Sequence, residues 1–322
     1  MALQAPDQVT ELYLTGRQLE RLELDLARFP NLRKLDLSGN RLRALPPSIA
    51  RLDRLEELVL TGNALTTLPE ALASCRRLRR LVLDGLPLTD LPAWLADLPG
   101  LDSLSANATR LQTLPRVLAR LRGLRALSLR GCGLEALPPD VSWPRLEALD
   151  LGQNALRRLP ASAKGWGALR VCRLDGNALT RLDLGHWPAL ELLHASGNRL
   201  RRWPDGLDAA RSLHTLDLSH NRLPDDARHE RRFPLLRRLL LQGNRLRRPP
   251  AWLAACPLLA VLDLSANPIE IWPEALCRFP CLEVLRLART RLTRLPEGAW
   301  QLGALTTLDL RRTPLSRLPA GW

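Results

Sequence analysis

The chain has 322 residues, of which 46% are hydrophobic but only 4% aromatic, so its core must consist mainly of aliphatic side chains. This composition favours many small repeated layers over one large globular core, and a fixed repeat would override the two domains that the length alone suggests. The net charge is +14, and all but two of the 47 basic residues are arginines, the exceptions being Lys34 and Lys164. The charge favours acidic partners, whereas the choice of arginine over lysine is also what GC-rich coding would produce.

One pattern, LxxLxLxxNxLxxLP, recurs along the whole chain and is clearest in residues 55–69. When its copies are aligned on Asn63, the equivalent positions are 17, 40, 63, 86, 109, 132, 154, 177, 198, 221, 244, 267, 290 and 313. The spacing is 23 residues, apart from one step of 22 and one of 21. These 14 copies run from about residue 9 to residue 319, so we predict that residues 1–322 form a single domain made of repeats.

Each copy is expected to begin as a strand and then to turn. Leu58 and Leu60 alternate with Val59, so the two leucines point inward and Val59 points outward. One strand from each copy would join its neighbours in a parallel sheet. Asn63 falls where the chain turns, and its side-chain amide can satisfy backbone groups of the turn from inside the coil.

The second part of each copy is expected to return along the opposite side as a short helical segment. Pro69 suits the first position of a helix, because no backbone hydrogen bond is lost there. In residues 70–78, helical spacing places Leu72, Cys75 and Leu78 on one face. We therefore predict that this face closes the core of the coil.

The repeats resemble those of leucine-rich repeat proteins, specifically the intracellular 23-residue class with the pattern LPxxLxxLxxLxLxxNxL, over residues 9–319. The resemblance implies an α/β solenoid, or horseshoe, of about 14 repeats. It places a parallel β-sheet on the concave side and short helical or 3-10 segments on the convex side. It is also typical of a bacterial protein, but it is far more specific for the fold than for the function.

The Asn position departs from the pattern in three consecutive copies, where it holds Leu86, Thr109 and Cys132. Leu86 cannot form side-chain hydrogen bonds, and the fifth copy also has Ala106 where an inward leucine belongs. These departures are compatible with a hinge or a locally widened site. They are also compatible with random divergence of the repeat sequence that the neighbouring repeats tolerate. We expect this stretch to be the least stable part of the array.

Two connections also break the pattern. Residues 183–188, DLGHWP, replace the usual LP and helix, and residues 224–234, PDDARHERRFP, follow Leu223. Both are expected to form irregular loops on the convex side, and the second one carries charge.

The outward residue in the middle of each LxL element defines a stripe on the concave face. From the seventh copy onward its charged members are Asp150, Arg173, His194, Asp217, Asp263, Arg286 and Asp309. Adjacent parallel strands lie about 4.8 Å apart, so these side chains are within reach of cross-strand pairing. The stripe is therefore either a self-satisfied charge ladder or a polar recognition surface, and one stripe can serve as both.

A second feature is an arginine ridge just after the Asn turn. The ridge consists of Arg157, Arg158, Arg199, Arg201, Arg202, Arg222, Arg245, Arg247, Arg248, Arg291 and Arg294. Residues 162–322 contain 25 basic and 15 acidic side chains and so hold +10 of the +14. The ridge is a candidate surface for an acidic protein partner, although a solvated arginine-rich edge is an equally good interpretation. Nucleic acid is disfavoured, because only Trp203 interleaves with the arginines.

No catalytic motif is found in the sequence. A phosphate-binding GxxxxGK loop, a GxSxG nucleophile elbow and a kinase signature are absent, and His229-Glu230 lacks the second histidine of HExxH. No cysteine precedes an aspartate by two residues, as in the ubiquitin ligases that some bacteria secrete. We predict no enzymatic activity, no metal and no cofactor.

The six cysteines, Cys75, Cys132, Cys172, Cys256, Cys277 and Cys281, form no CxxC pair and are expected to be reduced and partly buried. Neither a signal peptide nor a membrane-spanning run is recognised. We therefore predict a cytoplasmic scaffold or adaptor for another protein, with a role in signal transduction and without membrane insertion. The alternative is an effector, or the substrate-recognition part of a ubiquitin-ligase-type effector, delivered to a host cell by a specialised secretion system.

Overall fold

The computed structural model describes residues 5–226 and 231–318. The chain divides into two compact units. The first comprises Met1–Leu156 and Pro160–Trp166, and the second comprises Arg157–Leu159 and Gly167–Trp322. The single domain of residues 1–322 stays a prediction.

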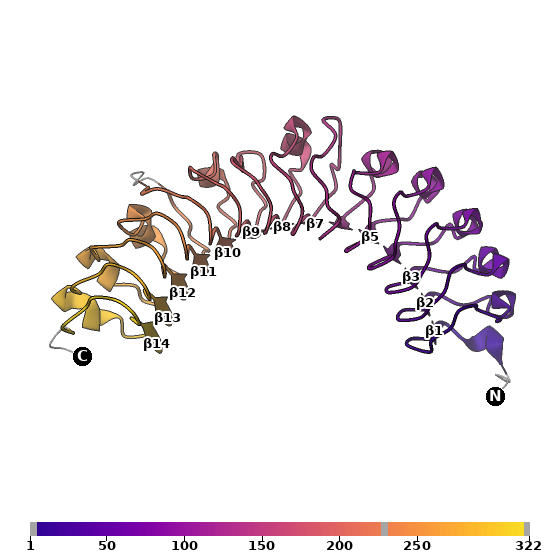
Figure 1. The fold of residues 1–322 in the computed structure, drawn as a ribbon, viewed down its shortest axis with the longest axis horizontal. Helices are drawn as coiled ribbons and strands as arrows, with labels where there is room; N and C mark the ends of the chain where they lie inside the picture. Colours follow the sequence, from indigo (N-terminus) through magenta and orange to yellow (C-terminus); the bar gives the residue numbers. More distant parts are fainter. Residues whose placement is uncertain (1–4, 227–230, 319–322) are drawn as a thin grey trace. The chain divides into compact units, whose positions relative to one another are not determined.

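The first unit contains seven parallel strands that pair in chain order. The strands are β1 (Glu11–Tyr13), β2 (Lys34–Asp36), β3 (Glu57–Val59), β4 (Arg80–Val82), β5 (Ser103–Ser105), β6 (Ala126–Ser128) and β7 (Ala148–Asp150). Its short 3-10 helices are η1 (Pro6–Gln8), η2 (Leu26–Arg28), η3 (Pro47–Arg51), η4 (Glu70–Ser74), η5 (Ala93–Asp97), η6 (Arg116–Arg120) and η7 (Ala161–Gly165). Strands and helices lie on opposite sides of the coils (Figure 1).

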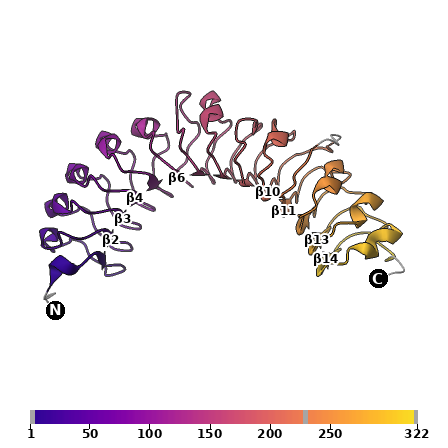
Figure 2. The same ribbon diagram turned by 180° about the vertical axis from the view of Figure 1, so that it is seen from behind.

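The second unit repeats this arrangement (Figure 2). Its strands are β8 (Val171–Arg173), β9 (Leu192–His194), β10 (Thr215–Asp217), β11 (Arg238–Leu240), β12 (Val261–Asp263), β13 (Val284–Arg286) and β14 (Thr307–Asp309). Its helices are η8 (Leu207–Ala209), η9 (Ala251–Ala255), η10 (Glu274–Cys277) and η11 (Glu297–Gln301). No helix in the described residues is long and apolar enough to cross a bilayer.

The predicted solenoid is confirmed, with one strand for each sequence repeat. In β3, Leu58 is fully buried and Val59 is only partly covered, as the alternation of leucines predicts. Equivalent residues stand opposite each other, for example Leu35 beside Leu58. On the helical side, Leu72, Cys75 and Leu78 are fully buried around η4, so the predicted inward face is also correct.

The asparagines of the repeat pattern hold neighbouring coils together. The Asn63 side-chain amide donates to the carbonyl of Leu60 in its own coil and to that of Leu37 in the preceding coil, both at 2.9 Å. Its oxygen accepts from the Leu42 amide at 3.0 Å. Asn221, Asn244 and Asn267 make the same bonds in the second unit. Each side chain therefore satisfies groups of two coils that would otherwise be buried without partners.

This asparagine ladder is interrupted in the first unit, as the sequence predicts. Leu86 is fully buried and contributes only packing. Thr109 bonds to the carbonyl of Ala106 at 2.9 Å and lies 3.3 Å from the Cys132 sulfur, which also reaches that carbonyl. Thr109 and Cys132 therefore replace part of the missing amide function.

A polar network on the strand surface accompanies the interruption. The Asp84 carboxylate accepts from the Ser105 hydroxyl at 2.6 Å and from the Asn107 backbone amide at 2.8 Å. The Asn107 side-chain oxygen in turn accepts from the Ser128 hydroxyl and from the Arg130 backbone amide, both at 2.7 Å. These bonds link the three coils in which the internal ladder is incomplete.

In the part of the chain that the structure describes, the two connections that break the pattern contain no helix, as expected. Asp183 forms an isolated parallel bridge with Asp205, and Gly185 packs against Gly206. Gly206 has φ +64°, a conformation that residues with a side chain rarely adopt. A Cβ at this position would also collide with the backbone of Gly185, so both the backbone conformation and the lack of space require glycine. In the second connection, residues 227–230 lie outside the described residues.

The second connection inserts a buried ion pair beneath the coil surface. The Arg231 guanidinium is 3% exposed and lies 3.2 Å from the Asp226 carboxylate, which also accepts from the Trp252 indole at 2.9 Å. Trp252 makes edge contacts with Trp203 and Phe233. Trp203 and Trp252 are both buried.

Replacing Asn63 by alanine should destabilise the first unit by about 2–4 kcal/mol, because two carbonyls and one amide in the core lose their partner. Urea denaturation followed by circular dichroism measures the change. Thr66, which is exposed, provides the control, and its replacement by alanine should cost less than about 0.5 kcal/mol. Equal effects of the two variants would contradict the role assigned to the ladder.

Replacing Asp226 by alanine should cost about 3–5 kcal/mol, because the buried Arg231 guanidinium loses its nearest carboxylate. Combining this change with Arg231→Leu should recover most of the loss. The control is Asp208→Ala, since that carboxylate is 57% exposed at 3.5 Å from Arg231 and should contribute at most about 1 kcal/mol. The same denaturation assay tests this, and a double variant no more stable than Asp226→Ala would refute the explanation.

Candidate functional site

The strand face carries the predicted polar stripe on the outward side. Each stripe residue is the last residue of its strand, and in the second unit equivalent residues are in register across neighbouring strands, such as Arg173 beside His194 and Asp263 beside Arg286. The complete set in that unit is Arg173, His194, Asp217, Leu240, Asp263, Arg286 and Asp309. The structure therefore brings these residues into one row.

The aspartates of the row are engaged mainly by local turns. Asp217 and Asp263 each accept a hydrogen bond from the backbone amide two residues later, at 2.9 Å. Asp150 in the first unit does the same at 2.9 Å, and Asp309 at 3.1 Å. This bond closes the turn after the strand, and the recurring LDL sequence is the signal from which it could have been inferred.

Cross-strand ion pairs along the stripe are fewer than the ladder interpretation requires. Among the stripe residues that the structure describes in the second unit, one ion pair crosses between strands, Asp263 with Arg286 at 3.8 Å. Asp309 pairs instead with Arg311 at 2.7 Å, and Asp150 in the first unit with Arg130 at 3.5 Å. The stripe is thus a row of turn-closing aspartates interspersed with accessible basic groups.

An alternating charge ladder does exist, but it lies three residues before the stripe, immediately before the strands. In the first unit its ion pairs are Arg33–Glu56 at 3.1 Å, Arg79–Asp102 at 3.0 Å and Arg125–Glu147. In the second unit Arg170 pairs with Glu191 at 2.6 Å. The alternation is visible in the sequence at intervals of one repeat from Arg33. It was not predicted, because it does not involve the LxL position. Such half-exposed pairs contribute little stability, but they neutralise this edge of the strand face.

The arginine ridge occupies the surface just beyond the Asn turns, and all of its members are exposed. Backbone hydrogen bonds hold successive positions together, because the Arg222 amide donates to the Leu200 carbonyl at 2.8 Å and the Arg245 amide to the Leu223 carbonyl at 3.0 Å. Equivalent arginines in adjacent coils are therefore fixed at the coil spacing of about 5 Å at the backbone.

Most charge on the central part of the ridge is uncompensated. Arg202 pairs with Asp205 at 2.8 Å, and Arg291 lies 3.9 Å from Glu270. Within the described residues 5–226 and 231–318, no carboxylate comes within 4 Å of the guanidinium groups of a central set of six. This set is Arg199, Arg201, Arg222, Arg245, Arg247 and Arg248.

Trp203, which interrupts the ridge in the sequence, offers no stacking surface. It is 7% exposed, and its indole nitrogen donates to the Pro224 carbonyl at 2.9 Å. Its ring packs against Trp252 and lies under the Arg231 guanidinium at 5.9 Å. An unstacked base would find no aromatic platform on the described part of the ridge.

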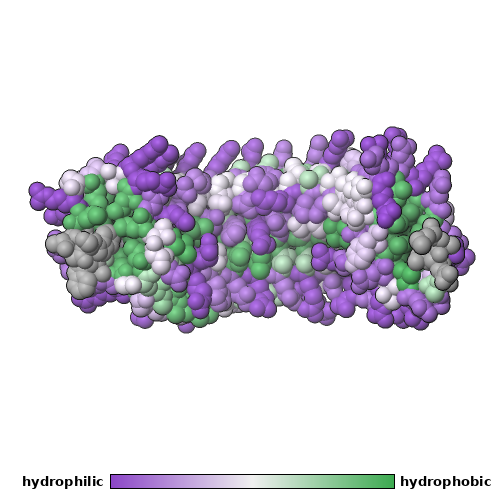
Figure 3. Space-filling model, turned by 90° about the horizontal axis from the view of Figure 1, so that it is seen from below, coloured by the Kyte–Doolittle hydropathy of each residue, from purple (hydrophilic) through white to green (hydrophobic). Residues whose placement is uncertain are grey.

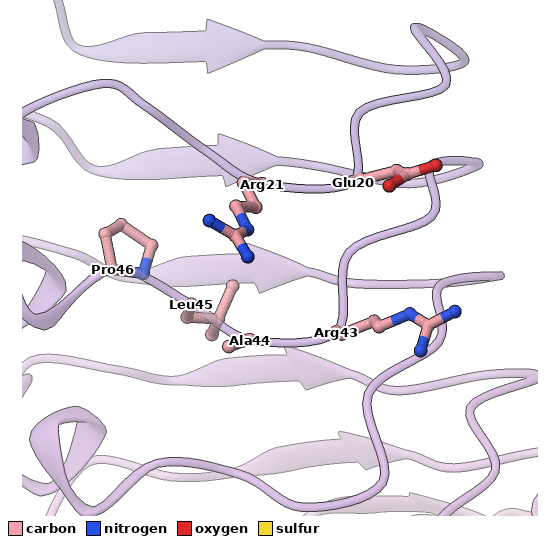
Figure 4. Close-up of a pocket in the computed structure, with 6 residues that line it drawn as sticks. All are labelled: Glu20, Arg21, Arg43, Ala44, Leu45 and Pro46. Carbon is pink, nitrogen blue, oxygen red and sulfur yellow. The ribbon is translucent and has the colours of Figure 1, made fainter.

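Among the surface grooves near the ends of the described chain, two lie between successive coils. The first, of about 500 Å³, is lined by Glu20, Arg21, Arg43, Ala44, Leu45 and Pro46 (Figure 4). The second, of about 510 Å³, contains Ile271 and Leu318, which are 57% and 56% exposed. Both combine apolar walls with arginine and glutamate at the rim, and neither brings together a nucleophile and a base.

The cysteines are unsuited to nucleophilic chemistry. Cys75, Cys132, Cys172, Cys256 and Cys277 are buried cysteines outside any disulfide, and Cys281 is partly covered. Burial raises the pKa of Cys75 to about 11 and that of Cys256 to about 12, so both stay protonated at neutral pH. In the described residues, no group of three or more histidine, cysteine or acidic side chains is arranged to hold a metal.

Hydrophilic side chains dominate the view in Figure 3, with apolar patches close to the two ends of the chain. The candidate site is therefore a charged surface and not a cleft. It consists of the polar stripe on the strand face and the uncompensated arginines beside it.

Family models match two parts of the chain, and both are described as leucine-rich repeats, at residues 30–88 and 209–227. No curated protein matches the sequence. Among solved structures, a leucine-rich repeat protein of Leptospira interrogans is similar, with 29% identity over 98% of this chain and 87% of that chain and a TM-score of 0.89.

Other solved structures share the fold at lower similarity. The internalin InlF of Listeria monocytogenes has 20% identity over 94% of this chain and 87% of its own, with a TM-score of 0.81. The PEPR1–AtPEP1 structure has 27% identity over 91% of this chain but only 43% of the other, with a TM-score of 0.75.

The pair formed by Asp309 and Arg311 provides a test of the electrostatics at the end of the stripe. Hydrogen bonds from the Arg311 guanidinium, with a further one from its backbone amide, hold the pKa of Asp309 at about 2, below its ordinary value of 3.8. The stabilisation is therefore complete above pH 3.8 and is lost as the pH falls through about 2. NMR titration of the carboxyl should give this midpoint.

The matched variants are Arg311→Ala and Arg312→Ala, because both arginines are exposed and adjacent. Arg311→Ala should raise the Asp309 midpoint towards 3.8, whereas Arg312→Ala should leave it unchanged. A wild-type midpoint at 3.8 would show that the bidentate pair does not form in solution.

Proposed function

The chain is a leucine-rich repeat protein, and from this premise we propose that it is a non-enzymatic scaffold or adaptor. It binds a partner protein through the strand face together with the adjacent arginine ridge. Leucine-rich repeats generally serve as interaction scaffolds, because the strands present one row of variable side chains per coil on a rigid frame.

The observation that carries the proposal is the uncompensated charge of the central ridge. Six exposed arginines have no carboxylate within 4 Å in the described residues, whereas four of the arginines that precede strands are paired with glutamate or aspartate. Arginine forks match carboxylates in geometry, so an acidic protein surface is the complementary partner. The polar stripe, with Arg173, His194 and Arg286 accessible among turn-closing aspartates, supplies a second contact row.

The similarity to a Leptospira protein over nearly the whole chain supports a bacterial origin. The buried, protonated thiols are compatible with a reducing compartment such as the cytoplasm. An effector delivered to a host cell would use the same surface, and a secretion-dependent translocation assay separates it from a resident adaptor.

Affinity capture from lysate tests the proposal. The wild-type chain should retain at least one specific protein, and the triple variant Arg245→Glu, Arg247→Glu, Arg248→Glu should lose at least about 90% of it, since each reversal replaces attraction by repulsion. A second variant, Arg173→Glu with Arg286→Glu, reports on the stripe.

The matched control is Arg41→Glu with Arg43→Glu, which alters exposed arginines at equivalent coil positions in the first unit. Circular dichroism melting curves ensure that all variants are folded. If the ridge and stripe variants both retain the same proteins as the control, this surface does not bind the partner and the proposal is wrong.

A further inference from the structure

The central ridge contains two copies of one sequence, NRLRR, at residues 198–202 and 244–248. The first arginine group is Arg199, Arg201 and Arg202, and the second arginine group is Arg245, Arg247 and Arg248. All six side chains are exposed, and one of them, Arg202, is paired with a carboxylate in the described residues. The ridge therefore contains two concentrated positive sites of the same form.

The coil between these groups has a different charge. This coil has the sequence NRLPD at residues 221–225. It therefore contributes Arg222, but Pro224 and Asp225 stand at the positions of the second and third arginines of each group. The exposed Asp225 carboxylate accepts from the backbone amides of Arg247 at 2.6 Å and Arg248 at 3.2 Å, so it is fixed beside the second group. The ridge therefore alternates between positive, mixed and positive coils.

The separation of the groups follows from the backbone. Strand β10 pairs in parallel with β9 and with β11. The backbone amides of Arg222 and Arg245 each donate a hydrogen bond to the preceding coil. These bonds fix the distance between the coils at the strands and at the ridge. Two coil spacings amount to about 10 Å. An extended polypeptide advances about 3.3 Å per residue, so about three residues span the same distance.

We propose that the ridge binds an extended acidic segment of the partner protein that runs across the coils. The segment presents two acidic sites about three residues apart, one to each arginine group, with a neutral residue facing Asp225. This inference rests on the proposed function and specifies the chemistry of its partner.

The alternation of charge favours a polypeptide over a uniform polyanion. A nucleic acid strand has a negative charge at every phosphate and would place one against Asp225, whereas a peptide can leave that place neutral. The buried Trp203 removes the aromatic platform that single-stranded nucleic acid would use.

The second arginine group is also held in advance of binding. Asp225 caps its backbone, and the next residue, Asp226, anchors the same connection to Trp252 and to the buried Arg231. A surface that is already ordered loses less conformational entropy when a ligand binds.

Fluorescence anisotropy with labelled peptides tests this arrangement in the full chain at about 0.15 M salt, where long-range attraction is screened. The spaced peptide has two Glu-Glu pairs separated by one serine. The filled peptide has glutamate in place of that serine, and the stretched peptide has the pairs about seven residues apart. The spaced peptide should bind at least about tenfold more tightly than the stretched peptide.

The decisive comparison uses the filled peptide, which has more charge. It should bind the wild-type chain about threefold more weakly than the spaced peptide, because its central glutamate meets Asp225. Asp225→Asn, which keeps an oxygen for both backbone amides, should remove this penalty. Tighter binding of the filled peptide to the wild-type chain would overturn the proposal in favour of a uniform polyanion, and a labelled thymidine oligonucleotide then identifies nucleic acid.

Matched charge reversals locate the binding site. Arg245→Glu with Arg247→Glu should weaken the spaced peptide at least about tenfold, and Arg41→Glu with Arg43→Glu less than about twofold. Equal losses, or no binding of the spaced peptide, would refute the inference. If the lysate partner still depends on Arg245, Arg247 and Arg248 in that case, the proposed function stands and only the spaced acidic segment is wrong.

Discussion

The buried asparagine side chain is the interaction on which the rest of this molecule depends. A coil of one strand and one short helix has too few residues to satisfy its turn groups alone, and a single amide that bonds to two coils solves the problem for both. Because the asparagine amide satisfies the turn from inside the coil, side chains on the outer side of the turn are not needed for these hydrogen bonds. The arginine ridge occupies this outer side.

The strand face shows how far the fold itself uses charged residues. Aspartates after the strands close turns, and the row before the strands pairs arginine with glutamate or aspartate across neighbouring coils. Where Leu86, Thr109 and Cys132 interrupt the internal ladder, Asp84 and Asn107 link the coils from outside. Much of the polar surface near the strands is therefore structural, whereas six arginines of the central ridge have no carboxylate within 4 Å in the described residues.

The irregular connection after Leu223 affects the ridge directly. It buries the Asp226–Arg231 pair and brings Asp225 to the backbone of the next coil. One departure from the repeat thus fixes the second arginine group and places a negative charge between two positive ones. Such a pattern can discriminate between acidic ligands by the spacing of their charges and not only by their total charge.

The sequence by itself determined the repeat length, the strand positions, the inward leucines and asparagines and the outward position of the arginines. It could do so because a period of 23 residues assigns every position in a coil the same environment as its equivalents. Only the tertiary structure decided which charges are neutralised, since pairing depends on side chains one coil apart, such as Arg33 with Glu56. It also showed that Trp203 is buried and that Asp225 caps Arg247 and Arg248, because these contacts come from a connection that does not follow the repeat.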